Sequence, residues 1–208
     1  DLYQRSLNDI GVNLPDGSPV ARLANSRLLG LSFRVYQVRG PSLFKKTLEN
    51  PDLNISHYLI GGDTRQLENI VQKARRVNPN LDIKGFFAPP MISKSEEMTR
   101  FLLDNVDPGE SQLIWLSLGT PKQDLVGLNL SSEWRKTVIG VGAAFDFYSG
   151  DKREAPEIIQ RFNLEWLFRL MSEPRRLWKR YLLGNFQFLF FWLICISSDR
   201  RWNRSNSK

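Results

Sequence analysis

The sequence predicts an α/β fold in which helices flank a mostly parallel sheet, followed by a basic, aromatic-rich helical appendage. Two observations carry this prediction. Strand-like apolar runs alternate with helix-like stretches over residues 1–160, a pattern that is typical of parallel sheets. Basic and aromatic residues are concentrated in residues 161–208, where the composition of the chain changes. We therefore expect an α/β core over residues 1–160 and a C-terminal appendage over residues 161–208.

Four predominantly apolar runs are predicted to form strands. They are "ISHYLIGG" (55–62), "LDIKGFF" (81–87), "SQLIWLSLG" (111–119) and "KTVIGVGAAFDF" (136–147). In parallel sheets, ligands collect at the carboxyl ends of the strands. The loops after Ile60, Leu118 and Phe147 are therefore the places where we expect a binding site.

Helices are predicted before and between these strands. Residues 19–29, 42–49, 64–77 and 95–105 have helical character, and a shorter helix is expected after Gln123. Asp63 or Thr64 can cap the helix over residues 64–77, and the pair Asn78-Pro79 ends it.

The composition excludes several kinds of site. The chain contains a single cysteine, Cys195, and a single histidine, His57. One cysteine cannot form an internal disulfide or a cysteine-built metal site, and it fits a reducing cytoplasm. One histidine leaves no His-rich metal site, and we interpret His57 as a residue of the first strand.

The net charge of +7 arises in the appendage. Residues 1–160 hold 19 basic and 19 acidic residues, whereas residues 161–208 hold 10 basic and 3 acidic residues. Aromatic side chains are interleaved with these charges, which is typical of segments at a membrane interface. The apolar run near residues 186–196 is shorter than the roughly 18–20 residues of a spanning helix. We expect it to lie on an anionic membrane surface; a packed helix or an oligomer contact with a solvated basic face stays open.

Two loops after predicted strands offer groups for a polar ligand. Gly61 and Gly62 follow a strand and open a helix, so their amides could cradle a phosphate, although a plain tight turn fits equally well. Gly119 shapes the turn in "LGTPKQD" (118–124), where Gln123 offers both a donor and an acceptor.

Two further segments carry carboxylates. Small residues around Gly142 indicate a close approach to the backbone, and Asp146 follows in "FDFYSG". Asp16 belongs to "LPDGSP" (14–19), where Asp-Gly is first of all turn chemistry. None of these motifs decides a function when it is taken alone.

Taken together and in order, the motifs resemble the WecG/TagA/CpsF family of bacterial glycosyltransferases. The resemblance covers nearly the whole chain and is most specific toward its C-terminal end. The matching motifs are "LPDG" (14–17), "GPSL" (40–43), "LGTPKQD" (118–124), "GVGAAFDFYSG" (140–150), "APE" (155–157) and "LEWLFRLMSEPRRLWKRY" (164–181).

The resemblance implies a Rossmann-like core and an inverting sugar transfer that needs neither a metal nor a cofactor. The donor would be a UDP-sugar carrying an N-acetylmannosamine-type sugar, a uronic acid or a hexose. The acceptor would be a polyprenyl-diphosphate-linked saccharide at the inner face of the bacterial cell membrane, where the enzyme would act as a cytoplasmic peripheral protein in cell-surface polysaccharide synthesis. The sequence contains no Asp-x-Asp, the motif that commonly holds a divalent cation in glycosyltransferases.

The resemblance also assigns roles to individual residues. Asp16 matches the proposed base of the family, and Gln123 matches a glutamine that contacts substrate. Arg169 and Arg176 match arginines that stabilise the leaving diphosphate, with the fork geometry that suits phosphate oxygens. Lys179 and Arg180 compete for a third phosphate contact. Asp146 is the competing carboxylate, for which we expect a structural or ligand-orienting role.

Some positions depart from the family pattern. Family members usually begin some tens of residues earlier, so we expect the N-terminal part of the family domain to be missing from this sequence. Gln37 stands where the family often has an arginine, Ser42 replaces an aspartate, and "PKQD" (121–124) replaces the commoner "PKQE". These differences predict a different donor sugar.

Two other functions stay open. A catalytically inactive, membrane-associated scaffold would keep the basic appendage without turnover. A nucleic-acid-binding module would use the same positive charge, and salt-sensitive binding to any duplex or single strand would favour it. We expect no nucleic-acid partner, and self-association into a homo-oligomer also stays open.

Overall fold

The computed structural model describes residues 9, 11–25, 32–162, 164–175 and 177–178. The chain divides into two compact units, which are treated one at a time. We call Asp1–Leu14 with Val38–Arg153 the core unit, and Pro15–Gln37 with Glu154–Lys208 the appendage unit. The expected division at residue 160 stays a prediction.

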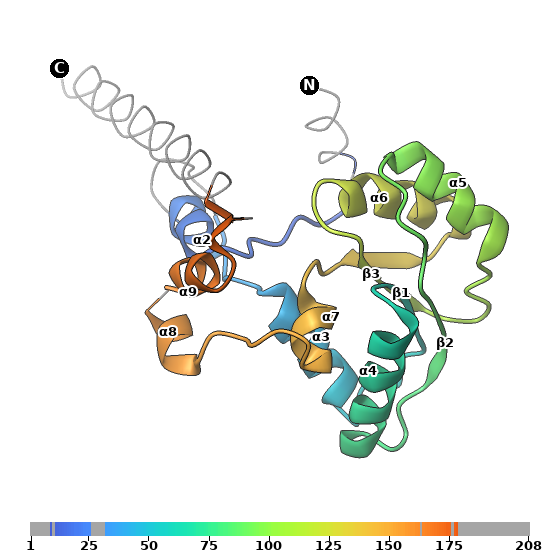
Figure 1. The fold of residues 1–208 in the computed structure, drawn as a ribbon, viewed down its shortest axis with the longest axis horizontal. Coiled ribbons are helices and arrows are strands. Elements are labelled where there is room, and N and C mark those ends of the chain that lie inside the picture. Colours follow the sequence, from blue (N-terminus) through green and yellow to red (C-terminus); the bar gives the residue numbers. More distant parts are fainter. Residues whose placement is uncertain (1–8, 10, 26–31, 163, 176, 179–208) are drawn as a thin grey trace. The chain divides into compact units, whose positions relative to one another are not determined.

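Within the described residues, the core unit is built on a four-stranded parallel sheet. The strands are β1 (His57–Gly61), β2 (Ile83–Phe87), β3 (Leu113–Ser117) and β4 (Thr137–Gly140), in the order β2-β1-β3-β4 (Figure 1). The two central strands align His57 with Leu113 at one end and Gly61 with Ser117 at the other.

Helices cover both faces of the sheet (Figure 1). The helices α3 (Gly40–Glu49), α4 (Thr64–Val77) and α7 (Ala144–Ser149) pack on one face, and α5 (Ser95–Asn105) and α6 (Lys122–Trp134) pack on the other. Because successive side chains of a strand point to opposite faces, Leu59 and Trp115 enter the core beneath α3, α4 and α7, whereas Ile60 and Leu116 enter the core beneath α5 and α6.

The strand order places a topological switch point between β1 and β3. The chain leaves β1 through α4 and returns in β2, and it leaves β3 through α6 on the opposite face and returns in β4. The connections after the two central strands therefore diverge at the carboxyl ends of these strands. Such divergence is the usual place of a ligand site in an open parallel sheet.

The structure confirms the first three strands within their predicted bounds and confirms the parallel α/β class. The helix α4 spans Thr64–Val77 as predicted, and the Asp63 carboxylate caps it by accepting from the Gln66 backbone amide at 2.8 Å. Asn78 is its C-cap.

Two predicted elements were wrong. The strand expected over residues 136–147 ends at Gly140, and residues 144–149 form the helix α7. The run is mostly apolar because both its strand part, with Val138 and Ile139, and its helical part, with Phe145, pack on the core, so hydropathy alone does not mark the change. Gly142, at a φ of 54°, turns the chain between the two parts. The helix after Gln123 is not short, since α6 has 13 residues.

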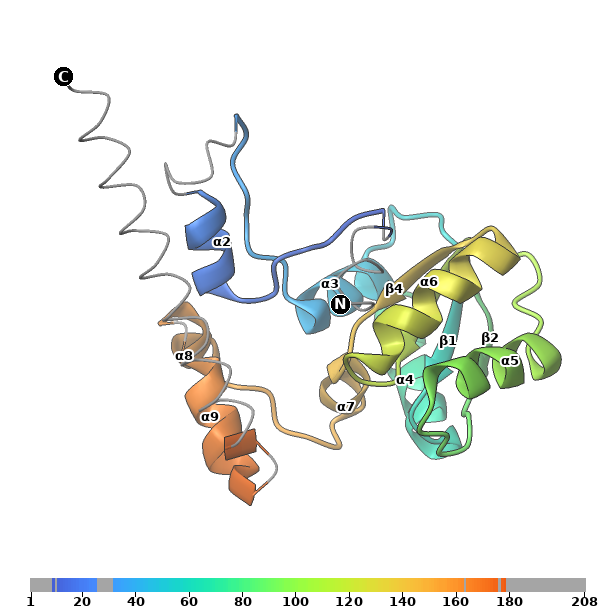
Figure 2. The same ribbon diagram turned by 90° about the horizontal axis from the view of Figure 1, so that it is seen from above.

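The appendage unit contains α2 (Ser18–Ala24), α8 (Glu157–Arg161) and α9 (Glu165–Ser172), and Figure 2 shows α8 and α9 beside each other. The end of α2 is tied to the following segment, because the Asn25 side chain accepts from the Val35 amide at 2.8 Å and donates to the Val35 carbonyl. The helix α9 ends at Ser172, with Glu173 as its C-cap, just before Pro174.

The apolar run near residues 186–196 lies outside the described residues. In the part of the chain that the structure does describe, no helix is both long enough and apolar enough to span a bilayer.

Candidate functional site

The candidate site lies at the carboxyl ends of β1 and β3, where the sheet topology changes direction. Hydrogen bonds and close backbone approaches link the sequence-predicted residues of the core unit into one group at this edge. These residues come from the end of β1, from the loops after β1, β3 and β4, and from the helices α6 and α7: Gly61, Gly62, Gly119, Gln123, Gly142 and Asp146.

Gly61 allows the two central strands to end close together. Its φ of 133° is a conformation that L side chains rarely adopt. A Cβ atom at this position would also collide with the carbonyl oxygen of Ser117. The carboxyl ends of β1 and β3 can therefore approach each other because residue 61 has no side chain.

Gly62 makes room for the side chain of Gln66. Its φ is 60°, and a Cβ atom there would overlap the amide oxygen of Gln66. At the start of α4, the backbone amide of Gln66 is already bonded to Asp63. The packing around Gly61 and Gly62 is therefore enough to explain why both residues are glycines. The role of this loop in cradling a phosphate stays a prediction.

Gln123 and Ser117 together hold the loop between β4 and α7. The buried Gln123 side chain accepts from the Gly142 amide at 3.0 Å, and the Ser117 hydroxyl donates to the Gly142 carbonyl at 2.6 Å. The Gln123 backbone amide also bonds to the Gly119 carbonyl at 2.9 Å, which fixes the start of α6. A Cβ atom at Gly140 would lie 3.0 Å from the side-chain nitrogen of Gln123, so a side chain there would displace the Gln123 amide.

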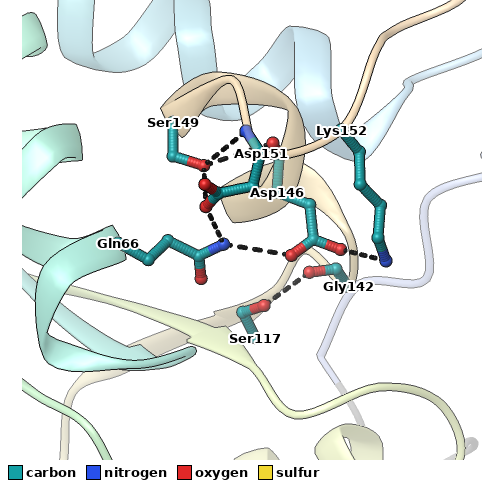
Figure 3. Close-up of polar contacts among 7 residues, drawn as sticks. All are labelled: Gln66, Ser117, Gly142, Asp146, Ser149, Asp151 and Lys152. Carbon is teal, nitrogen blue, oxygen red and sulfur yellow. Dashed lines mark hydrogen bonds and ion pairs between the residues drawn. The ribbon is translucent and has the colours of Figure 1, made fainter.

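Asp146 belongs to a polar network in which one amide joins two carboxylates (Figure 3). The Gln66 side-chain nitrogen donates to Asp146 Oδ1 at 3.1 Å and to Asp151 Oδ2 at 2.8 Å. The ammonium of Lys152 lies 2.7 Å from Asp146 Oδ2. Ser149 donates its hydroxyl to Asp151 at 2.7 Å.

The network favours the ionised form of Asp151. The Ser149 hydroxyl, the Gln66 amide and the nearby charge of Arg65 hold the pKa of this carboxyl below its usual value. Because the side chain is exposed, solvent screens these interactions.

Sequence reasoning missed Gln66, Ser117, Ser149, Asp151 and Lys152. Ser117 had one available signal, since it is the last residue of β3 and parallel strands present ligand groups at that end. Gln66 had no comparable signal, because its partners lie 80 and 85 residues further along the chain.

The remaining predicted residues belong to the appendage unit. Asp16 is exposed, and its carbonyl accepts from the Gln37 side chain at 2.6 Å, just before the N-cap of α2. Arg169 lies in α9, where its side chain is partly buried. Arg176 and Arg180 lie outside the described residues. The catalytic and phosphate-binding roles of these four residues stay predictions.

An open sheet of parallel strands, with helices on both faces and polar groups at the switch point, defines a Rossmann-like α/β protein. The chain belongs to the glycosyl transferase WecG/TagA/CpsF family, whose model matches residues 1–203. This match confirms the glycosyltransferase class expected from the sequence motifs.

Two curated relatives carry the same name, N-acetylglucosaminyldiphosphoundecaprenol N-acetyl-beta-D-mannosaminyltransferase. The protein of Bacillus spizizenii (strain W23) is 26% identical over 182 residues, which cover 86% of this chain and 67% of the relative. The protein of Bacillus subtilis (strain 168) is 30% identical over 174 residues, covering 81% of this chain and 63% of the relative. The chain thus spans about two thirds of the length of these relatives.

Proposed function

We propose that this chain transfers an N-acetylmannosamine-type sugar from a UDP-sugar to a polyprenyl-diphosphate-linked acceptor that ends in N-acetylglucosamine. The observation that carries the proposal is the family match over residues 1–203, together with two relatives whose shared name specifies that sugar and that acceptor. A uronic acid or a hexose is the alternative donor sugar, in keeping with the departures at Gln37 and Ser42.

The geometry of the core unit supports a donor site at the carboxyl ends of β1 and β3. The predicted residues Gln123 and Asp146 both belong to this edge, and Gln123 is held in place through Gly142. A ligand rich in hydroxyl groups suits the side chains at this edge, because each hydroxyl can both donate and accept a hydrogen bond.

The transfer itself needs a base and a group that stabilises the leaving diphosphate. Asp16 takes the proton of the acceptor hydroxyl while that oxygen attacks the anomeric carbon, and UDP leaves from the opposite side, so the configuration inverts. Arg169 and Arg176 stabilise the negative charge that develops on the departing phosphate, and Lys179 or Arg180 supplies the third contact. The reaction proceeds without a bound metal.

The appendage unit would bring the enzyme to its lipid-linked acceptor. Around α9, the side chains of Phe162, Trp166 and Met171 are exposed, and the basic excess of the sequence follows them. Exposed aromatic groups beside basic residues suit an anionic leaflet, where each Lys or Arg near the surface contributes about 1 kcal/mol. The enzyme would work as a peripheral protein at the inner face of the membrane.

Mass spectrometry of a lipid-linked N-acetylglucosamine acceptor, after incubation of the full chain with a panel of UDP-sugars, tests the function. We expect a mass increase of one N-acetylhexosamine with UDP-N-acetylmannosamine, and the same increase in excess EDTA. Asp16→Asn should slow the transfer by about 10²–10⁴ without weakening donor binding. Liposome binding without any transfer would instead indicate a scaffold, and a strict requirement for Mn²⁺ or Mg²⁺ would reject the arginine-based mechanism.

A further inference from the structure

Gln66 occupies an unusual position in the candidate site. Its side chain is 7% exposed, and its single amide nitrogen is shared between two carboxylates of the α7 region. The amide oxygen packs over Gly62, in a space that any Cβ atom at residue 62 would fill. The orientation of the Gln66 amide is therefore fixed from both sides.

We propose that Gln66 is a positioning residue, which holds the Asp146 carboxylate so that it accepts a hydroxyl of the sugar or ribose of the donor. The inference rests on the proposed function, and it names a residue and a part of the substrate that the sequence motifs do not.

The chemistry of Asp146 favours a hydroxyl over a phosphate as its ligand. A carboxylate offers about four acceptor positions, and Gln66 and Lys152 each take one here. The side chain is 28% exposed, so part of its accepting capacity faces solvent. Carboxylate and phosphate oxygens repel each other, whereas a hydroxyl donates to the remaining acceptor positions. The same reasoning places the diphosphate away from Asp146.

Lys152 completes a donor-acceptor pair with Asp146. Its ammonium lies 2.7 Å from the carboxylate and its side chain is 36% exposed. Its backbone amide also bonds to the Asp146 carbonyl at 3.0 Å, which fixes the turn after α7. An adjacent acceptor and donor match two neighbouring hydroxyls of a sugar, because each hydroxyl can both donate and accept.

A cation site is a weaker explanation of the same carboxylates. Among the described residues, no group of three Asp, Glu, His or Cys side chains is arranged to hold a metal ion. In addition, the Gln66 amide points its hydrogens at Asp146 and Asp151, so it supplies donors where a cation would need acceptors.

A double-mutant cycle tests the proposal with the full chain, using donor KM, acceptor KM and kcat as readouts. Gln66→Met keeps the length of the side chain but removes the amide, and it should raise the donor KM by about tenfold or more while the acceptor KM stays unchanged. In an Asp146→Ala background, the same change should have little further effect, because Gln66 acts through Asp146. Gln112→Met is the matched control, since Gln112 is hydrogen-bonded to Ser56 at the opposite end of the same strands and should leave the kinetics unchanged.

Gln66→Glu gives an independent readout that a purely structural role would not produce. The introduced carboxylate would face Asp146 and Asp151, with Asp63, Arg65 and Lys152 as the other charged groups nearby. Like charges favour the protonated form of this introduced carboxyl group, which can again donate a hydrogen bond. Relative to the wild type, kcat/KM of this variant should therefore rise as the pH is lowered from about 8 to about 6.

The outcomes separate the inference from the proposed function. The positioning role would be overturned if Gln66→Met lowered kcat/KM equally with and without Asp146, or if it raised the donor KM and the acceptor KM equally. In either case the wild-type chain would still transfer sugar, so the proposed function would stand. A wild-type chain that neither transfers sugar nor binds a UDP-sugar in calorimetry would overturn the proposed function, and the inference with it. Donor binding can also be measured directly where turnover is slow. The inference is supported if Gln66→Met weakens donor binding by about tenfold or more when Asp146 is present, but not in the Asp146→Ala background.

Discussion

The two ends of the β1–β3 pair carry polar clusters of different kinds. At the amino end, Ser56 and Gln112 bond to each other, and the Trp115 indole donates to His57 Nδ1 at 3.2 Å. At the carboxyl end, Gln66 reaches from α4 to Asp146 and to the residues after α7. The same two strands thus end near the buried side chains of Ser56 and His57 on one side and near the partly exposed Asp146 on the other.

The difference lies in exposure and in unused bonding capacity. His57 is fully buried, and burial lowers its pKa to about 4, so the ring is neutral and its Nδ1 serves the indole of Trp115. Asp146 remains partly exposed and keeps acceptor positions beyond those used by Gln66 and Lys152. A buried, neutral ring that accepts from a buried indole contributes to the stability of the fold, whereas a partly exposed carboxylate with remaining acceptor positions can bind a ligand. We therefore propose a structural role for the amino end and ligand recognition for the carboxyl end.

The largest effect is expected where the two strands meet at the carboxyl end. Gly61→Ala adds an unfavourable φ and a collision with the Ser117 backbone, so it should lower the free energy of unfolding by about 4 kcal/mol. Gly109→Ala is the control, because Gly109 also has a positive φ but open space around it, and it should cost only about 1 kcal/mol. Denaturant unfolding measures both, and equal losses would show that the close approach of the strands is unimportant.

The amino end should control stability in acid. The pKa of His57 is about 4 in the folded chain and near 6.5 when it is unfolded, so the unfolded state binds the proton more readily. The contribution of the neutral His57 to the free energy of unfolding is complete above about pH 6.5 and is lost as the pH falls toward 4. The loss over this range amounts to about 3 kcal/mol.

His57→Asn keeps an acceptor for Trp115 and removes the titrating ring. The free energy of unfolding of this variant should change less between about pH 7 and about pH 4 than that of the wild type. A wild-type curve that is already flat over this range would contradict the buried, neutral imidazole.

The carboxyl end should control catalysis rather than stability. Asp146→Ala should reduce kcat/KM by about 10²-fold, because a hydroxyl of the donor loses its charged acceptor. The melting temperature should change by only a few degrees, since the side chain is partly exposed. Steady-state kinetics and thermal unfolding of the same variant test this prediction. A fall in the melting temperature without a fall in kcat/KM would contradict it.

The smallest effect is expected at the rim of the network. Asp151→Asn removes one of the two carboxylates that share the Gln66 amide but leaves the bond to Asp146 in place. Donor KM should therefore change by no more than about threefold, in line with an exposed interaction. A loss as large as that of Asp146→Ala would place Asp151 in the binding site itself.

The fold was largely predictable because the strands and helices obey simple periodicities. Hydropathy found β1, β2 and β3, and the Asp63 cap together with Asn78 bounded α4. The prediction failed at residues 141–147, because a strand followed by a short helix gives a mostly apolar segment when both pack on the core.

The parts of the site that depend on local sequence motifs could be predicted. The parts that depend on contacts between residues far apart in the sequence could not. Gly61 ends β1, Gln123 and Asp146 lie in the helices that follow β3 and β4, and the strand order brings all three to one edge. The roles of Gln66 and Lys152 follow from three-dimensional contacts, since Gln66 meets its partners only through the packing of α4 against α7. No local pattern around Gln66 distinguishes it from an ordinary residue in the first turn of a helix.

We propose that the carboxyl ends of β1 and β3 bind the sugar nucleotide. A crystal structure of the full chain with UDP-N-acetylmannosamine tests it most directly. We expect the ligand to lie between the loops after Gly61 and Ser117, with a sugar or ribose hydroxyl within hydrogen-bonding distance of Asp146. A nucleotide bound elsewhere, with the Gln66 network unoccupied by ligand, would contradict it.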